Sequence, residues 1–126
     1  MIPVLAVDDH LANLKLLEAI LSRHGYAVTS ATNAAEALRL IARSKPRAIL
    51  MDIALPGMDG YELTRKLKAD PQTRDIVIVA VTAYAMKGDR EKAIAAGCDD
   101  YISKPIDAKQ LRSILARRVG GQQGPK

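Results

Sequence analysis

Short apolar runs alternate with amphipathic stretches along most of the chain. Residues 2–7 form a near-continuous apolar run, and residues 48–51 and 76–81 form two more. Short runs without alternation are typical of strands that are buried on both faces of a parallel sheet. Residues 26–31 and 100–103 have the composition of strands but are more polar, which favours positions at the sheet edges. The pattern therefore predicts three central strands and two edge strands.

A helical pattern follows each predicted strand. Apolar residues recur at the spacing of a helix face, and residues that cap helices stand at several of the expected boundaries. In chain order, the signals are Leu14, Leu17 and Leu21 on one face, Gly25 after them, the capping-box-like pair Asn33 and Glu36, Leu63 and Leu67 before the Asp70-Pro71 stop, a fourth helix running toward Gly97, and Asp107 with Gln110 at the start of the last helix.

Five strand–helix units in this order predict the α/β class, as a (βα)5 doubly wound parallel sheet covered by helices on both faces. Placing the apolar strands in the centre and the polar ones at the edges gives the flavodoxin-like strand order 2-1-3-4-5. In such a sheet the ligand site lies beyond the carboxyl ends of the strands. The order reverses between strands one and three, so we expect the site there.

Composition limits the class of protein. The length of 126 residues suits one domain, and 48% hydrophobic residues suffice for a packed core. Cys98 is the single cysteine, so no internal disulfide can form. We expect this domain to span residues 1–119, and the glycine-rich residues 120–126 to be a flexible tail or the start of a linker. There is no signal-peptide pattern and no apolar run near ~20 residues, so we expect a cytoplasmic protein without membrane insertion.

The net charge of +5 raises the question of nucleic acid. The basic residues are spread over several helical segments, and the chain has no Trp or Phe that could stack on bases. We therefore expect no nucleic-acid partner.

Polar residues follow the predicted strands where each one ends. Asp8 and Asp9 follow the first strand, Asp52 ends the third, Thr82 ends the fourth and Lys104 follows the fifth. Parallel strands bring these residues to the same edge of the sheet. Three carboxylates there repel one another unless a cation bridges them, and Mg²⁺ binds carboxylate and phosphate oxygens together. With a hydroxyl and an ammonium group, this set predicts a phosphoryl-transfer site.

These residues lie in motifs of a known family. Over residues 2–118 the chain resembles the receiver domain of two-component response regulators. The motifs are Asp8-Asp9 with Asn13, the stretch from Met51 through Asp52 to Gly60, Val81-Thr82-Ala83, and Tyr101-Ile102-Ser103-Lys104-Pro105. The stretch from Ala80 to Asp89 is similar to single-domain cell-cycle regulators and to the receivers of hybrid histidine kinases.

The resemblance implies a role for each residue. Asp52 would be the nucleophile that accepts a phosphoryl group, and Thr82 and Lys104 would hold the phosphoryl oxygens. The ligands of Mg²⁺ would be Asp9, Asp52 and the Ala54 carbonyl oxygen, with Asp8 acting through water. Thr82 and Tyr101 would form a switch, and a cis bond before Pro105 would turn Lys104 toward the site.

The resemblance also implies partners. The donor would be a sensor histidine kinase or a histidine phosphotransfer protein. Phosphorylation would change the face formed by the fourth helix, the fifth strand and the fifth helix, which would then bind a downstream output protein or a second copy of the chain. Such a module modifies itself and has no turnover substrate. The runner-up is a degenerate receiver that binds partners without phosphate.

The chain departs from the commonest family pattern beside the phosphoacceptor. Ala54 stands two residues after Asp52, and Tyr84 stands two residues after Thr82. Neither side chain easily positions a water molecule for attack, so we expect slow self-dephosphorylation. Ala54 also disfavours an aspartyl-phosphate phosphatase, which needs a second Asp at that position. A flavin module is disfavoured because Asp8 and Asp9 would repel its phosphate.

The remaining reactive side chains carry no prediction of chemistry. We expect Cys98 to be a small packed residue after Gly97. His10 and His24 are too isolated in the sequence to predict a metal site or a phosphodonor.

Overall fold

The computed structural model describes residues 1–55, 57–83 and 88–120 and consists of strictly alternating strands and helices. In chain order these are β1 (Ile2–Val7), α1 (Leu11–Ser22), β2 (Tyr26–Ala31), α2 (Ala34–Arg43), β3 (Ala48–Asp52), α3 (Gly60–Ala69), β4 (Val77–Thr82), α4 (Asp89–Ala96), β5 (Asp100–Ser103) and α5 (Ala108–Val119). All five predicted strand–helix units are present. Residues 121–126 lie outside the described residues, so the division into a domain and a tail stays a prediction.

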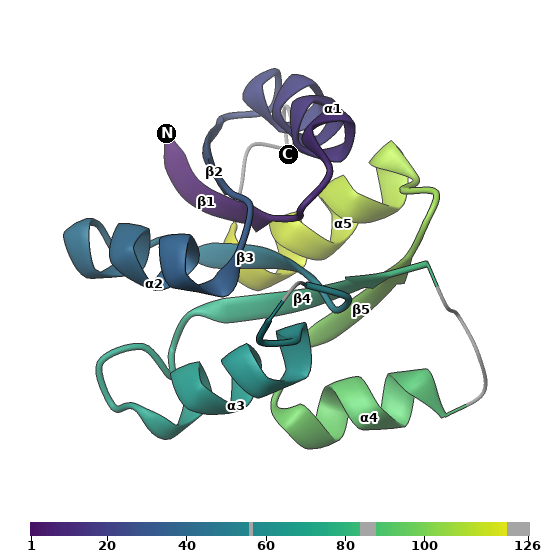
Figure 1. Ribbon diagram of the computed structural model, residues 1–126. Helices are drawn as coiled ribbons and strands as arrows, with labels where there is room; N and C mark the ends of the chain where they lie inside the picture. The colour runs from purple at the N-terminus through teal and green to yellow at the C-terminus, as the bar shows by residue number, and fades with distance from the viewer. Residues whose placement is uncertain (56, 84–87, 121–126) are drawn as a thin grey trace.

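The strands form one parallel sheet in the order β2-β1-β3-β4-β5, which confirms the predicted fold class. Helices α1 and α5 lie on one face of the sheet, and α2, α3 and α4 lie on the other (Figure 1). The order reverses at β1, which pairs with both β2 and β3. The carboxyl ends of β1 and β3 therefore lie next to each other.

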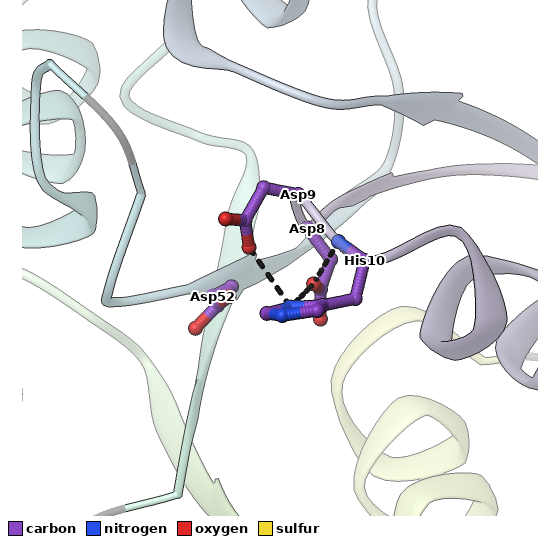
Figure 2. A group of neighbouring side chains, drawn as sticks. All are labelled: Asp8, Asp9, His10 and Asp52. Carbon is purple, nitrogen blue, oxygen red and sulfur yellow. Dashed lines mark hydrogen bonds and ion pairs between the residues drawn. The ribbon is translucent and has the colours of Figure 1, made fainter.

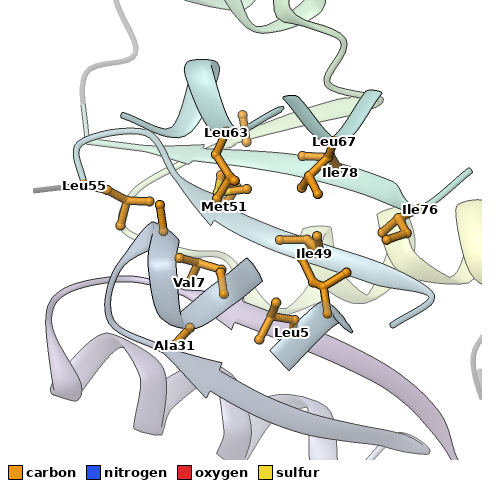
Figure 3. Close-up of a cluster of buried hydrophobic side chains, with 14 of the residues drawn as sticks. Leu5, Val7, Ala31, Ile49, Met51, Leu55, Leu63, Leu67, Ile76 and Ile78 are labelled. Atoms are coloured by element: carbon orange, nitrogen blue, oxygen red, sulfur yellow. The ribbon is translucent and has the colours of Figure 1, made fainter. Parts of the chain in front are cut away.

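The central strands bury both of their faces. Leu5 and Val7 of β1 belong to the cluster under α2, α3 and α4, part of which is drawn in Figure 3. Val4 and Ala6 belong to the cluster under α1 and α5. This alternation puts apolar residues on both sides of one strand, which explains the near-continuous apolar run in the sequence. All five residues of β3 are buried, whereas β2 and β5 contain partly exposed positions, as predicted for edges.

Side-chain caps fix the starts of several helices. The Asn33 side chain accepts a hydrogen bond from the Glu36 N–H at 2.8 Å, as the capping pattern predicts. The Glu36 carboxylate accepts from the Thr32 N–H at 2.7 Å, one residue before the position of a standard capping box. Asp107 caps α5 by accepting from the Gln110 N–H. Among the described residues, no helix combines the length and the apolar character needed to cross a bilayer.

Candidate functional site at the carboxyl edge of the sheet

Polar residues converge where the strands end at the carboxyl edge of the sheet. Asp8 and Asp9 follow β1, Asp52 is the last residue of β3, and Lys104 follows β5. Figure 2 shows Asp8, Asp9 and Asp52 together with His10. The parallel sheet thus places acids from two strands that are far apart in the sequence around one point.

One ammonium group lies between two of these acids. The Lys104 Nζ is 3.2 Å from the Asp8 Oδ2 and 3.6 Å from the Asp52 Oδ2. The side chain of Lys104 is 19% exposed, whereas those of Asp8 and Asp52 are almost fully buried. A single positive charge is therefore shared between two buried negative charges, with the partly exposed Asp9 beside them.

The Asp8 carboxylate is held in place by groups of its own loop and of α1. It accepts hydrogen bonds from the His10 N–H at 2.8 Å and from the Asn13 amide at 3.1 Å. Together with Lys104, these donors fix both oxygens of Asp8. This arrangement explains why Asn13 accompanies the acidic pair in the sequence motif.

Asp52 is less well satisfied. Its Oδ1 accepts one hydrogen bond, from the Ala54 N–H at 3.2 Å, and its Oδ2 faces Lys104 at 3.6 Å. Burial raises the pKa of the Asp52 carboxyl, and repulsion from Asp8 and Asp9 raises it further, against the lowering effects of the Ala54 N–H and Lys104. The ionised form of Asp52 thus lacks part of the stabilisation that it would need in this environment.

The backbone after Asp52 is fixed by a close approach to α3. A Cβ at Gly60 would lie 2.6 Å from the Asp52 carbonyl oxygen and 2.8 Å from the Ile53 Cα, so only glycine fits there. The Gly60 N–H also donates to the Ile53 carbonyl at 2.9 Å. Gly60 belongs to the motif read from the sequence, but its role in positioning Asp52 depends on a contact between the β3 end and α3 that spacing alone does not give.

The prediction that His10 is isolated was wrong. Its Nδ1 lies 3.0 Å from the Asp9 Oδ1 and 3.3 Å from the Asp8 Oδ1. One potential ligand atom from each of Asp8, Asp9, His10 and Asp52 lies within 4.8 Å of all the others. The sequence contains no second histidine or cysteine near His10, which is why the prediction failed: the neighbours of His10 are carboxylates, and one of them comes from another strand.

The other predicted site residues occupy the same edge or lie near it. Thr82 is buried at the end of β4, and its carbonyl oxygen accepts from the Lys104 N–H at 2.8 Å. Tyr101 in β5 packs, partly buried, against the core cluster under α2, α3 and α4. The peptide bond between Lys104 and Pro105 is cis, as the resemblance implied. Tyr84 lies outside the described residues.

The donor set fits a hard divalent cation. Three carboxylates gather here, two of them facing the Lys104 ammonium group, and oxygen atoms are the ligands that Mg²⁺ prefers. A cation here would offset the repulsion that now raises the pKa of Asp52. The roles of individual residues, including the predicted Ala54 carbonyl ligand, remain predictions.

Comparison with known proteins shows the family of the chain. Residues 4–116 match the family model described as the response regulator receiver domain. The chain is 41% identical over 117 residues to the polar-differentiation response regulator DivK of Brucella anthropi, covering 93% of this chain and 95% of DivK. It is 46% identical over 108 residues to the response regulator PleD of Caulobacter vibrioides, covering 86% of this chain but only 24% of PleD.

Solved structures give the same result. The receiver domain of the sensor histidine kinase PA1611 from Pseudomonas aeruginosa, which has magnesium coordinated in its active-site cleft, is 41% identical with a TM-score of 0.85, covering 94% of this chain and 97% of that one. The Ssk1 receiver domain of Saccharomyces cerevisiae, solved with the histidine phosphotransfer protein Ypd1, is represented by a match at 28% identity and a TM-score of 0.85, covering 93% and 88%.

Proposed function

Since this chain belongs to the response regulator receiver domain family, we propose that Asp52 is its phosphoacceptor and that the acids beside it hold Mg²⁺. The observation that carries the proposal is the position of Asp52: a buried carboxylate at the end of a central strand, 3.6 Å from the Lys104 ammonium and beside Asp8 and Asp9. A carboxylate used only for structure would be expected to have more partners of its own.

The reaction follows from the chemistry of these groups. An oxygen of the Asp52 carboxylate attacks the phosphorus atom of a phosphohistidine, a P–O bond forms, the P–N bond breaks, and the imidazole of the donor leaves. Lys104 and the Thr82 hydroxyl stabilise the phosphoryl oxygens in their new position. Asp9, Asp52 and the Ala54 carbonyl oxygen would hold the cation, with Asp8 acting through water. A bound Mg²⁺ supplies the positive charge that lets anionic carboxylate and phosphoryl group approach each other.

Phosphorylation then changes a binding surface. Thr82 ends β4 and Lys104 directly follows the neighbouring strand β5, and the Lys104 N–H donates to the Thr82 carbonyl oxygen at 2.8 Å. A shift of Thr82 toward the phosphoryl group is therefore passed to β5, where Tyr101 responds by moving inward. The face formed by α4, β5 and α5 changes its affinity for an output protein or for a second copy of the chain.

The proposed setting is the cytoplasm, with a sensor histidine kinase or a histidine phosphotransfer protein as donor. The complex of Ypd1 with the related Ssk1 receiver supports a donor of this kind. The chain modifies itself once per cycle and has no turnover substrate. Because the Ala54 methyl group cannot hydrogen-bond a water molecule in position for attack, the phosphoryl group persists until a partner removes it. Loss of the phosphoryl group from the purified phosphoprotein within seconds would contradict this slow self-dephosphorylation.

Intact-mass measurement tests the proposal. The protein is incubated with acetyl phosphate, with Mg²⁺ or with a chelator, as wild type, Asp52→Asn and the control Asp75→Asn, an exposed acid paired with Lys45. We expect one added phosphoryl group on the wild type and on Asp75→Asn only with Mg²⁺, and none on Asp52→Asn. An unmodified wild type would favour a degenerate receiver, and a modified Asp52→Asn would move the acceptor elsewhere.

A further inference from the structure

We propose that the His10 imidazole is a direct ligand of the cation at this site, through its Nδ1, and that it shifts the site's preference from Mg²⁺ toward borderline ions such as Co²⁺ and Zn²⁺. The inference rests on the proposed function, because it concerns the same cation site, and it concerns a residue that the family motifs quoted above do not include. It makes the metal preference of this chain depend on one side chain.

The spacing of the donor atoms supports direct ligation. In an octahedral site with bonds of about 2.1 Å, neighbouring ligand atoms lie about 3 Å apart and opposite ones about 4.2 Å apart. The His10 Nδ1 lies 3.0 Å from the Asp9 Oδ1, which is the spacing of two neighbouring ligands. It lies 3.3 Å from the Oδ1 of Asp8, the acid that acts through water in the proposed function. One ligand atom from each of Asp9, His10 and Asp52 lies within 4.8 Å of the other two, so a small contraction would bring these three atoms to the spacing of ligands on one ion (Figure 2).

The backbone holds His10 at this place. His10 is the N-cap residue of α1, with extended dihedral angles, and its N–H donates to the Asp8 Oδ1 at 2.8 Å. The loop is therefore fixed to one of the acids, and the imidazole need not be brought in from elsewhere. The side chain is 69% exposed, so its ring can adjust to an ion without repacking the core.

The charge of the site leaves room for a ligand of this kind. Asp8 and Asp9 both lie beside the His10 ring, and Lys104 is the ammonium group that faces Asp8 and Asp52. A neutral imidazole adds a donor atom without adding charge. Carboxylate oxygens suit Mg²⁺, whereas imidazole nitrogen suits Co²⁺, Ni²⁺, Cu²⁺ and Zn²⁺. A site that combines both types is expected to bind the second class of ions more tightly than an all-oxygen site does.

The competing interpretation is that His10 only donates a hydrogen bond to Asp9 and orients it. Removing an orienting group weakens every ion that Asp9 binds by a similar factor. Removing a direct nitrogen ligand weakens the borderline ions selectively. The ratio of two affinities therefore separates the two roles, where a single affinity would not.

Calorimetric titration measures that ratio. Co²⁺ and Mg²⁺ are titrated separately into the wild type, His10→Ala and His24→Ala, the last being a matched control because His24 lies against Arg112, whose Nη1 is 3.2 Å from its Nε2. For His10→Ala we expect Co²⁺ affinity to fall about tenfold or more relative to Mg²⁺ affinity. The ratio should stay at the wild-type value in His24→Ala. Equal losses for both ions in His10→Ala would overturn direct ligation.

A spectroscopic measurement reads the bond itself. With Mn²⁺ bound, electron spin echo modulation from a coordinated ¹⁴N nucleus is expected in the wild type and in His24→Ala, and is expected to vanish in His10→Ala. No nitrogen modulation in the wild type would overturn the proposal even if the affinities shift. Far-UV circular dichroism of each variant confirms that the fold is kept.

Failure of this inference can be told from failure of the proposed function. One outcome is that the wild type binds Mg²⁺ and takes up a phosphoryl group from acetyl phosphate while the ratio of Co²⁺ to Mg²⁺ affinity is the same in the wild type and in His10→Ala. In that case only the proposed role of His10 is wrong. If the wild type neither binds Mg²⁺ nor is modified, the cation site itself is wrong, and the His10 proposal falls with it.

Discussion

Two groups of aspartate and lysine side chains lie at opposite ends of the strands, one at the amino edge and one at the carboxyl edge of the sheet. They differ in how completely their charges and hydrogen-bonding groups have partners. At the amino edge, Asp99 precedes β5 and meets Lys68 of α3 at 2.9 Å. At the carboxyl edge, Lys104 faces Asp8 at 3.2 Å and Asp52 at 3.6 Å. The two regions share the same residue types but not the same balance of charge.

The amino-edge pair is balanced one to one. The Asp99 carboxylate also accepts the Ile78 N–H at 2.8 Å, and the Lys68 ammonium also donates to the carbonyl oxygens of Arg74 and Ile76. Each charge therefore has a partner of opposite sign and backbone groups around it. A pair with these contacts ties α3 to β4 and β5 and needs nothing further.

Among the residues that the structure describes, Lys104 is the one ammonium group in contact with the acids of the carboxyl edge. Lys104 is shared, and burial together with neighbouring acids raises the pKa of Asp52. In this fold the candidate site is therefore marked by unbalanced charge, whereas the balanced Asp99–Lys68 pair has a structural role. The proposed Mg²⁺ would supply the positive charge that this group needs.

The largest expected effect on stability is at the amino edge. Lys68→Met leaves the Asp99 carboxylate without its cation and the carbonyl oxygens of Arg74 and Ile76 without this donor. We therefore expect the free energy of unfolding to fall by about 2 kcal/mol, a value reduced from that of a fully buried pair because both groups are partly exposed. Urea denaturation measures the loss. Adding Mg²⁺ should stabilise this variant by the same amount as the wild type. A larger Mg²⁺ effect on the variant would mean that the amino-edge pair is not independent of the cation site.

Lys104→Met is expected to give a smaller loss that depends on metal. In chelator, the remaining acids repel one another without an ammonium group, and we expect a loss of about 1 to 2 kcal/mol. A cation can replace the missing charge, so Mg²⁺ should raise the free energy of unfolding of this variant at least as much as that of the wild type. If Mg²⁺ stabilises the wild type and leaves Lys104→Met unchanged, the carboxyl edge does not behave as a charge deficit.

The pH dependence of stability should distinguish Asp52 from an ordinary carboxyl. Because burial raises its pKa in the folded state, the native protein binds this proton more tightly than the unfolded chain does. The stability that this proton provides is present below the unfolded pKa of Asp and is lost as the pH rises through the folded pKa.

Asp52→Asn should remove the loss of stability that the wild type shows as the pH rises through the folded pKa of Asp52. In chelator at pH 7 we expect the variant to be more stable than the wild type by about 1 kcal/mol, with the difference shrinking toward zero below about pH 4. Denaturation curves of both proteins across this range give the result. A variant that is less stable than the wild type at pH 7 would mean that the Asp52 carboxylate is already satisfied.

The smallest effect is expected for an exposed pair that belongs to neither edge group. Arg118 Nε lies 3.3 Å from the Asp100 Oδ2, and the Arg118 side chain is 42% exposed. Arg117 contacts the same carboxylate oxygen at 3.7 Å. Arg118→Ala should therefore change the free energy of unfolding by less than about 0.5 kcal/mol, with or without Mg²⁺. A larger change would mean that the losses of unfolding free energy expected for the Lys68 and Lys104 variants are too small.

The sequence was enough to predict the fold and the meeting of Asp8, Asp9, Asp52 and Lys104 at one edge, because both depend on repeated local signals. Apolar runs marked the central strands, and the residues after them had to meet at one edge. The edge positions of β2 and β5 followed from their polarity and are confirmed by the strand order. The family motifs in turn are confirmed by the match to the receiver domain model.

What could not be predicted depends on contacts between distant segments. His10 carried no signal because its neighbours are acids, among them Asp52 from another strand. The need for glycine at position 60 arises from the Asp52 carbonyl oxygen, and only the packed loop reveals that distance. The Asp99–Lys68 pair joins residues 31 positions apart, with no pattern in the sequence to connect them.

Mapping the modified residue tests the central claim most directly. The wild type is treated with acetyl phosphate and Mg²⁺, the acyl phosphate is reduced with borohydride, which converts a phosphorylated aspartate to homoserine, and the peptides are sequenced by mass spectrometry. We expect homoserine at position 52 alone, and only when Mg²⁺ is present. Homoserine at position 8, 9 or 99, or at no position in a folded protein with Mg²⁺ bound, would contradict it.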